Sequence, residues 1–396
     1  MYLYGGKTQN FFEFFHKSVF PLHTECAILK GRFNLFAEDF KKMYSFKNDY
    51  SEGAHPDILK ALSTCSGEQN AAYGTDKHSA AAADMIRELC SSPKSGVAFA
   101  GGGTPANILA ICALLRNPYE AAVCASTGHI NVHETGALEY AGHKIIEVPA
   151  KADGKLTPAG IESVLKTHAS EHMVVPKLVY ISQTTENGTI YSKAELSALC
   201  DCCRKNGLFL YVDGARLGSA LMAEENDVSL ADLAAMTDAF CMGGTKNGLL
   251  LGEALVMQNE EMQDHLRWIM KQKGFMLAKG FVVGIQFEEA LRDGLFFNMA
   301  KHANEAAEKI AEAVEQSGFE FFAKPQSNQL FVILPPELAE EAHEKFCCNI
   351  DRLLEDGRAV IRIVTSWATT EEAVEEISAW LIKQLCFGLV KSIIEA

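Results

Sequence analysis

The chain has 396 residues, of which 48% are hydrophobic, and its 51 acidic and 36 basic residues give a formal net charge of −15. This length suits one large domain plus a smaller one. The negative charge disfavours nonspecific binding to nucleic acid or to an anionic membrane, so a soluble protein that binds small molecules fits better.

No stretch reaches the roughly twenty apolar residues of a membrane span, and the N-terminus lacks the apolar region of a signal peptide. The 12 cysteines follow no repeated CxxC spacing, which is typical of reduced thiols in a cytosolic protein. The cysteines at 200–203 fit a helical apolar pattern with Leu196 and Leu199, so we interpret them as buried side chains rather than zinc ligands. We therefore expect a cytoplasmic protein without a metal site.

Residues 1–42 differ from the rest because phenylalanine is frequent and strand-like alternation is weak. We interpret them as an N-terminal extension that is not native or is weakly ordered, with Met43 as the physiological start. The alternative is an amphipathic helix packed on the body of the protein.

After residue 95, short apolar runs alternate with helical patterns, which is typical of a mostly parallel sheet covered by helices. The predicted strands are residues 96–100, 121–124, 144–148, 178–181, 208–212 and 239–242. Residues 105–115 and 193–205 have helical spacing. The sequence thus predicts an α/β fold with a seven-stranded type of sheet in a large domain, residues 43–290, in which residues 43–70 form an N-terminal arm.

The C-terminal part shows a different order of patterns. A long helical region at about residues 260–317 leads out of the sheet. Predicted strands at residues 319–322, 329–333 and 359–364 then alternate with predicted helices at 337–356 and 370–385. We therefore expect a smaller C-terminal α/β domain that comprises residues 291–396.

Lys246 lies in the glycine-framed segment Met242-Gly-Gly-Thr-Lys-Asn-Gly248, downstream of an apolar strand that ends on Asp213. Ligands of open α/β sheets bind at this end of the strands. A lysine amine can form an imine, and a carboxylate can hold the proton of a pyridinium ring. The pair predicts a site for pyridoxal 5′-phosphate, and a helix cap is the alternative role of Asp213.

The turn Ala100-Gly-Gly-Gly-Thr-Pro-Ala-Asn107 follows a strand and opens a helix. Its backbone amides and the helix dipole can bind an anion, so we predict that Gly103 and Thr104 bind the cofactor phosphate. The alternative is a purely structural turn. A dinucleotide site is disfavoured because the GxGxxG pattern is missing.

Three further residues complete the predicted site. His129 follows the strand at 121–124 and is a candidate to stack on the cofactor ring, although an isolated histidine is more often a packed or surface residue. Arg216 and Arg362 are candidates to bind a substrate carboxylate bidentately. Because Arg362 interrupts an apolar strand, a structural ion pair is its alternative role.

Together these motifs resemble the threonine aldolase family, within the β-eliminating lyases of the aspartate aminotransferase superfamily. The resemblance covers about residues 43–383. It rests on the glycine turn and on Val212-Asp-Gly-Ala-Arg216, Gly244-Thr-Lys246, Ser327-Asn-Gln-Leu-Phe-Val332 and Ile361-Arg-Ile-Val-Thr365. It implies a fold type I pyridoxal phosphate enzyme, in which Lys246 bonds to the cofactor.

The resemblance also implies the roles of the other residues. Asp213 would hold the ring nitrogen, His129 would stack on the ring, and Gly103 and Thr104 would bind the phosphate. Arg216, beside the cofactor, would bind the substrate carboxylate together with Arg362.

Further roles follow from positions that match or depart from the family pattern. Asn48 falls where many members have a serine that contacts the carboxylate, and Tyr73 matches an active-site tyrosine near the subunit boundary. Glu186 replaces a histidine near the substrate hydroxyl, and Leu277 replaces a cofactor-site arginine. Lys279 is then our candidate for the phosphate charge.

The implied activity is cleavage of a β-hydroxy-α-amino acid, of the L-threonine or allo-threonine type, into glycine and an aldehyde. A base must remove the hydroxyl proton; we favour Glu186 over His133 or an ordered water. The alternatives are another β-eliminating lyase, an aminotransferase on the same fold, or a noncatalytic cofactor-binding homologue. The resemblance also implies a homodimer or homotetramer with the active site between subunits.

Overall fold

The computed structural model describes residues 44–395, with side chains described through residue 384. The predictions about residues 1–42 and about a start at Met43 lie outside the described residues. Within residues 44–395, none of the helices combines the length and apolarity that crossing a membrane requires.

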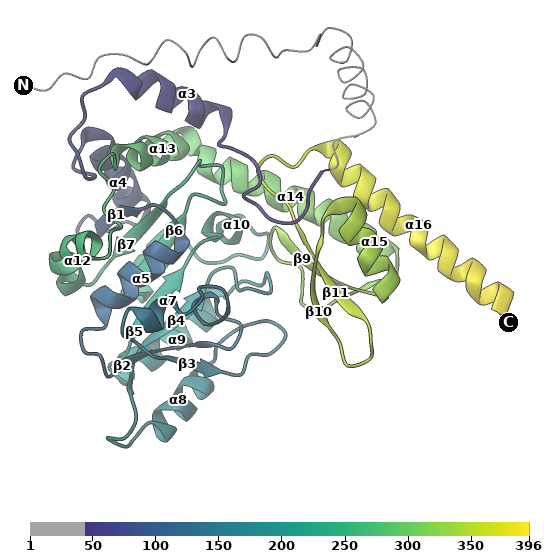
Figure 1. Cartoon of the computed structure of the whole chain (residues 1–396), viewed down its shortest axis with the longest axis horizontal. Helices are drawn as coiled ribbons and strands as arrows, with labels where there is room; N and C mark the ends of the chain where they lie inside the picture. Colours follow the sequence, from purple (N-terminus) through teal and green to yellow (C-terminus); the bar gives the residue numbers. More distant parts are fainter. Residues whose placement is uncertain (1–43, 396) are drawn as a thin grey trace, which may run out of the picture. The chain divides into compact units, whose positions relative to one another are not determined.

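The main sheet has seven strands in the order β1-β7-β6-β5-β4-β2-β3 (Figure 1). Its strands are β1 Gly96–Ala100, β2 Glu120–Ala125, β3 Ile145–Val148, β4 Val175–Ser182, β5 Phe209–Asp213, β6 Ala239–Gly243 and β7 Glu253–Met257. Neighbouring strands are parallel except at β7, which runs antiparallel to β1 and β6. The predicted fold class is therefore confirmed.

Helices cover both faces of this sheet. Along β6, Phe240 packs into one apolar core and Cys241 into the other, because successive side chains of a strand point to opposite faces. Leu199 and Phe287 contribute to the first core, and Leu109 contributes to the second. The helices of this region are α3 Pro56–Thr64, α4 Lys77–Leu89, α5 Gly103–Leu114, α6 His129–Val132, α7 Ala137–Tyr140, α8 Pro158–Thr167, α9 Lys193–Lys205, α10 Leu217–Leu221, α11 Leu230–Met236, α12 Glu260–Gln272 and α13 Phe281–Leu291, with short 3₁₀ turns at Cys65–Gly67 and Arg292–Gly294.

Helix α9 shows how local sequence sets an element. Its N-terminus has a capping box, in which the N-cap Ser192 and the third helical residue Glu195 each accept a hydrogen bond from the other's backbone N–H. Its buried face carries Leu196, Leu199 and the three cysteines of the 200–203 cluster. The interpretation of these cysteines as buried side chains is therefore confirmed.

The C-terminal region contains a second, four-stranded antiparallel sheet in the order β10-β11-β9-β8. Its elements are α14 Leu295–Gln316, β8 Glu320–Phe321, β9 Gln329–Leu334, α15 Pro336–Phe346, β10 Asn349–Leu353, β11 Ala359–Val364 and α16 Glu371–Glu395. The smaller α/β region is thus present as predicted. Its boundary at residue 291 and the arm at residues 43–70 stay predictions.

One predicted element is wrong in its second half. The expected helix at 337–356 ends at Phe346, and β10 follows it. Cys347 adopts a left-handed conformation with φ of 54°, which ends the helix. Gly357, with φ of 88°, then turns the chain from β10 into β11. The Asp356-Gly357 pair is a hairpin signal that this prediction did not use.

Candidate active site

A cavity of about 680 Å³ lies at the carboxyl ends of the parallel strands of the main sheet. Five predicted site residues line it, namely His129, Glu186, Arg216, Lys246 and Arg362. The first four follow β2, β4, β5 and β6, and the fifth belongs to β11 of the small sheet. The strand-end location agrees with the position of ligands in open α/β sheets.

Lys246 follows β6 and its side chain reaches the cavity, where Nζ lies 5.8 Å from the centroid of the Tyr50 ring. Burial lowers the pKa of Lys246, and the positive charge of Arg216 lowers it further. Nearby carboxylates, first that of Asp49, oppose this shift without cancelling it. The lowered pKa increases the fraction of neutral amine, which is the form that attacks an aldehyde.

Asp213 ends β5 and is 4% exposed. Its Oδ2 accepts hydrogen bonds from Asn107 Nδ2 at 2.8 Å and from the Tyr180 hydroxyl at 2.7 Å. Its Oδ1 accepts from the backbone N–H of Ala215 at 2.9 Å. These three donors compensate the burial of the carboxylate and fix its orientation, while leaving lone pairs for another donor.

His129 is the first residue of α6, and its ring is oriented by a carboxylate that the sequence analysis missed. Its Nδ1 lies 2.8 Å from Oε1 of Glu134, which is 6% exposed. The same oxygen accepts from Asn107 Nδ2 at 2.7 Å. Glu134 therefore favours the proton on Nδ1 and links the histidine through Asn107 to Asp213.

Glu186 follows β4 and lines the cavity. Its Oε1 accepts from the backbone N–H of His129 at 2.8 Å and from the hydroxyl of Ser182. Burial raises the pKa of Glu186 above its ordinary value. A carboxylate with a raised pKa is a stronger base, which suits proton abstraction.

The two predicted carboxylate-binding arginines differ in their surroundings. Arg216 makes a bidentate ion pair with Asp49, with Nε–Oδ2 and Nη2–Oδ1 distances of 2.7 and 3.0 Å. Asp49 is 1% exposed and also accepts from Asn328 Nδ2 at 2.9 Å. The guanidinium of Arg216 thus already has a carboxylate partner, which the sequence analysis did not anticipate.

Arg362 still has N–H groups that are free to donate hydrogen bonds to a ligand. Its Nη2 lies 3.5 Å from the backbone oxygen of Lys47, and its buried Nε has no hydrogen-bond partner among the described residues. Burial lowers the pKa of Arg362, and Arg216 lowers it further. An unpaired buried donor beside a cavity is costly unless a ligand satisfies it, so Arg362 fits a substrate anion better than a structural ion pair.

The glycine turn lies beside the same end of the sheet. Helix α5 begins at Gly103, and Asn107 in its second turn bonds to Asp213. A Cβ placed on Gly103 would meet nothing within 4 Å, so the first turn has open space in front of it. The backbone amides of Gly103 and Thr104, at the start of this helix, have no intrahelical acceptor, which suits an anion such as a phosphate.

Six predicted residues are absent from the cavity lining: Asp213, Gly103 and Thr104, which lie at the strand end and the glycine turn described above, and Asn48, Tyr73 and Lys279. Asn48 uses its side-chain oxygen to accept from the backbone N–H of Tyr50 at 2.9 Å. Tyr73 is 42% exposed and lines a different cavity, and Lys279 is exposed in the loop before α13. Leu277, in the same loop, lies against Gly101 of the glycine turn. The roles of Asn48, Tyr73 and Lys279 stay predictions.

The donor set around the cavity fits pyridoxal phosphate. It offers an amine for the aldehyde, a strand-end carboxylate for the ring nitrogen and a helix N-terminus for the phosphate. The buried hydroxyl of Thr127, which lines the cavity, has no hydrogen-bond partner within the described part of the chain. Such an orphaned group is explained when a polar ligand binds next to it.

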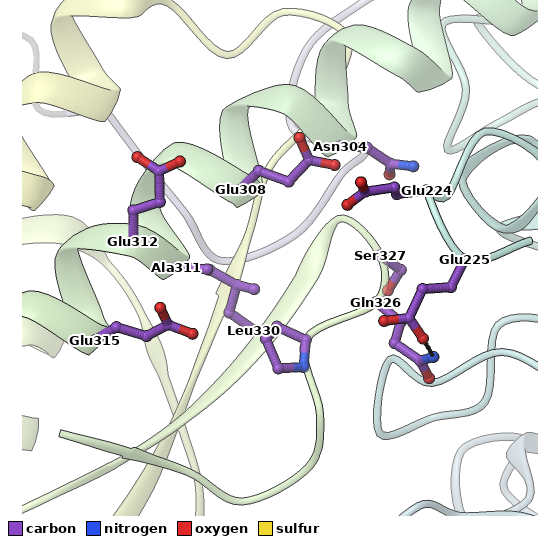
Figure 2. A pocket seen from close by; sticks show the side chains of 11 residues that line it. Glu224, Glu225, Asn304, Glu308, Ala311, Glu312, Glu315, Gln326, Ser327 and Leu330 are labelled. Atoms are coloured by element: carbon purple, nitrogen blue, oxygen red, sulfur yellow. Dashed lines mark hydrogen bonds between the residues drawn. The ribbon is translucent and has the colours of Figure 1, made fainter.

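A second cavity, of about 240 Å³, has a different chemistry. Figure 2 shows its glutamates: Glu308, Glu312 and Glu315 from α14, and Glu224 and Glu225 from the loop after α10. Gln326 Nε2 donates to Glu225 at 2.7 Å, and Lys324 pairs with the same carboxylate. An acidic cluster alone does not define a site, and we assign it no ligand.

Comparisons with known proteins agree with the geometry. Residues 55–335 match the β-eliminating lyase family. The chain is 32% identical over 336 residues to the low specificity L-threonine aldolase of Pseudomonas aeruginosa, which covers 84% of this chain and 95% of that protein. It is similar in structure to the threonine aldolase of Leishmania major, with a TM-score of 0.84 and 44% identity over 86% of this chain and 99% of that one.

A more distant structure shares the fold. A putative L-allo-threonine aldolase from Listeria monocytogenes is 18% identical, with a TM-score of 0.66 over 89% of this chain and 99% of that one. The chain therefore belongs to the β-eliminating lyases, in the branch that contains the threonine aldolases. The family and the enzyme class predicted from the sequence, a lyase, are confirmed.

Proposed function

We propose that the protein is a pyridoxal-phosphate-dependent aldolase that cleaves a β-hydroxy-α-amino acid, of the L-threonine or allo-threonine type, into glycine and an aldehyde. The observation that carries the proposal is the composition of one cavity. It holds an amine with a lowered pKa at Lys246, a guanidinium at Arg362 whose Nε has no partner among the described residues, and a carboxylate with a raised pKa at Glu186.

The cofactor would be held by residues from several strand ends. Lys246 would bond to it, Asp213 would accept a hydrogen bond from the ring nitrogen, and His129 would stack on the ring. The amides of Gly103 and Thr104 would bind the phosphate, with Lys279 as an additional positive charge in our sequence-based assignment. When bound, pyridoxal phosphate accepts the electron pair of the bond that breaks at Cα of the substrate.

The substrate carboxylate would bind Arg362, whose Nε is unpaired among residues 44–395. Arg216 would form the adjacent wall of the cavity, and Asp49 keeps its guanidinium in place. In the sequence-based assignment, Asn48 also contacts the carboxylate. By fixing the carboxylate, these residues would orient the substrate for cleavage of its Cα–Cβ bond.

Glu186 would remove the proton of the β-hydroxyl group. The pKa of Glu186 is raised toward neutral pH, and a general base is most efficient when its pKa lies near the working pH. His133 lines the same cavity and is the second candidate, but burial lowers its pKa and makes it a weaker base. The family pattern has a histidine at position 186. The carboxylate at this position in our chain therefore also affects which substrate side chains the cavity accepts.

We also propose that the chain forms a homodimer or a homotetramer in the cytoplasm, with active sites at subunit boundaries. Tyr73 supports this proposal because its side chain is exposed and does not line the cavity that contains Lys246. It lines a different cavity of the same chain. Light scattering of the purified protein tests the assembly, and a monomer with full activity would contradict it.

The activity is tested with cofactor-loaded protein and five amino acids: threonine, allo-threonine, phenylserine, serine and cysteine. The expected products are glycine and an aldehyde from the first three. Pyruvate from serine or cysteine without any aldehyde would indicate a β-eliminating reaction instead, and a keto acid would indicate transamination. Failure to bind the cofactor would indicate a noncatalytic homologue.

A further inference from the structure

Gln329 is a buried side chain whose amide group has no role in the chemistry described above. It is the first residue of β9, it lines the cavity that contains Lys246, and it is only 1% exposed. Its Oε1 and its Nε2 are both buried, and neither atom has a hydrogen-bond partner within the described part of the chain. A buried polar group without a partner is unfavourable, so this amide needs an explanation.

Two other buried amides near the same strand end have partners at both of their ends. Gln183 is 3% exposed, and its amide bonds to the backbone of Tyr191 at 2.9 and 3.2 Å. Asn187 lines the same cavity as Gln329, but its Oδ1 accepts from Arg352 at 3.2 Å and its Nδ2 donates to a backbone oxygen at 2.8 Å. Gln329 therefore differs from these amides because both of its polar atoms are left for a ligand.

The small sheet places Gln329 on the same side as the proposed carboxylate ligand. Arg362 of β11 pairs with Phe331 of β9, and Gln329 lies two positions before Phe331 in the same strand. Alternate residues of a strand face the same side of a sheet, and directly paired residues of neighbouring strands share that side. Gln329 and Arg362 thus project from one face, and both line the cavity.

The loop that carries the proposed base lies against Gln329. A Cβ placed on Gly188 would lie 3.3 Å from the Cβ of Gln329 and 2.7 Å from its backbone oxygen. Glu186 lies two positions before Gly188 and lines the cavity as well. The side chain of Gln329 therefore begins next to both the strand of the carboxylate ligand and the loop of the base.

The substrate has one part that the proposed site does not yet bind. Its carboxylate is assigned to Arg362, its hydroxyl proton to Glu186 and its amino group to the cofactor, which leaves the substituent on Cβ. Val132 is the one aliphatic side chain in the cavity lining of the described residues, so the cavity offers little apolar surface to a methyl group. An amide accepts and donates hydrogen bonds, and its natural partners are uncharged groups that do the same.

We propose that Gln329 is a specificity-determining residue that hydrogen-bonds an uncharged polar substituent on Cβ of the substrate. The preferred substrates are then β-hydroxy-α-amino acids that carry a hydroxymethyl or carboxamide group where threonine carries a methyl group. A site that is built to hydrogen-bond a substrate group rejects an analogue without it, because the buried polar atoms stay unpaired. This inference rests on the proposed aldolase function, since it concerns the substrate of that reaction.

The test measures how tightly the cofactor-loaded, full-length protein binds three amino acids that lack the β-hydroxyl group and are therefore not cleaved. At the position in question, α-aminobutyrate has a methyl group, homoserine a hydroxymethyl group and asparagine a carboxamide. The change of visible absorption on addition of each amino acid gives its dissociation constant. We expect homoserine or asparagine to bind about tenfold more tightly than α-aminobutyrate, which corresponds to one buried hydrogen bond.

A single substitution shows whether the amide causes this preference. Gln329→Met keeps the length of the side chain and removes both polar ends. The dissociation constants of the three amino acids should then agree within about twofold, because none of them gains a hydrogen bond at this position. If Gln329 only shapes the cavity, all three amino acids should instead bind more weakly by the same factor.

Melting temperatures without any amino acid give an independent readout. Gln329→Met should not lower the melting temperature, because the amide has no partner among the described residues. Gln286→Met is the matched control, since Gln286 is fully buried, its Oε1 accepts from the backbone N–H of Leu250 at 2.7 Å and its Nε2 donates to two backbone oxygens. This control should melt at a lower temperature than the unmodified protein.

The inference is overturned if the unmodified protein binds α-aminobutyrate as tightly as homoserine and asparagine, a result that requires no variant. It is also overturned if Gln329→Met folds and keeps the preference, or if this variant loses as much stability as Gln286→Met. Failure of the proposed function gives a different result. The three amino acids would then bind with the expected preference, but threonine would yield no aldehyde.

Discussion

The strand-end cavity and the acidic cavity are both rich in charged groups, but they balance these charges in different ways. Around Lys246, each carboxylate contacts a donor or a cation, as the ion pair between Asp49 and Arg216 illustrates. In the acidic cavity, Glu308 is surrounded by like charges, and burial followed by Glu224 raises its pKa. A reaction site combines opposite charges and unpaired donors at fixed distances, whereas a patch of one charge does not.

The largest expected effect comes from removing the amine. Lys246→Ala should abolish the visible absorption of the cofactor-loaded protein and lower kcat by a factor on the order of 10⁴ or more, because the cofactor loses its covalent attachment. Absorption spectra and an aldehyde assay measure both effects. If Lys246→Ala kept the visible absorption, Lys246 would not be the attachment site of the cofactor. The contrast between a reaction site and an acidic patch would then lose its basis.

The next effect concerns the base and its pH dependence. Glu186 acts in its deprotonated form, so activity should rise as the pH rises through its raised pKa. Glu186→Gln should lower kcat by about 10²- to 10⁴-fold and should remove this acidic limb from the profile of kcat against pH. If the limb persists in the variant, another group, first of all His133, is the base.

Arg362 should contribute less than the base, and mainly to binding. Arg362→Lys keeps the charge but loses the fork of donors, so kcat/KM should fall about 10- to 100-fold, mostly through KM. Steady-state kinetics with threonine measure the change. An unchanged KM would mean that the carboxylate binds elsewhere, and Arg216 would be the first candidate.

The ion pair of Asp49 sets the stability of the cavity wall. Asp49→Asn leaves the guanidinium of Arg216, whose side chain is 14% exposed, without its charged partner. Breaking a buried pair of this kind costs about 3 kcal/mol in the free energy of unfolding. Urea denaturation measures this loss, and Asn328→Asp, which adds a like charge beside Asp49, should also destabilise the protein.

The smallest effect is expected in the acidic cavity. Because the pKa of Glu308 is raised in the folded protein, its contribution to stability is greatest at low pH and falls as the pH rises above the ordinary pKa of glutamate. Glu308→Gln should therefore raise the melting temperature slightly at neutral pH and leave kcat/KM unchanged. A large loss of activity would show that the two cavities do not differ in the way described here.

The sequence was sufficient to place those candidate site residues whose position follows from the end of a strand. Asp213 ends an apolar run and Lys246 stands between glycines, so both were recognisable without coordinates. Glu134 was missed because its role depends on the short helix α6, which turns it toward His129 and Asn107. An acidic residue five positions after the histidine was the available signal.

Asp49 and β10 show a second limit. Asp49 meets Arg216 across 167 positions of sequence, and local patterns carry no information about such a contact. The residues of β10 are mostly exposed or half-buried, so no apolar alternation marks them as a strand. Elements that are fixed by distant partners or by a turn are therefore less predictable than buried parallel strands.

The central claim is that Lys246 forms the covalent link to the cofactor in the strand-end cavity. The most direct measurement is chemical reduction of the pyridoxal-phosphate-loaded protein, followed by peptide mass spectrometry to locate the attached group. The account predicts that the group is found on the peptide that contains Lys246. Attachment at Lys279 or another lysine, or no attachment at all, would contradict it.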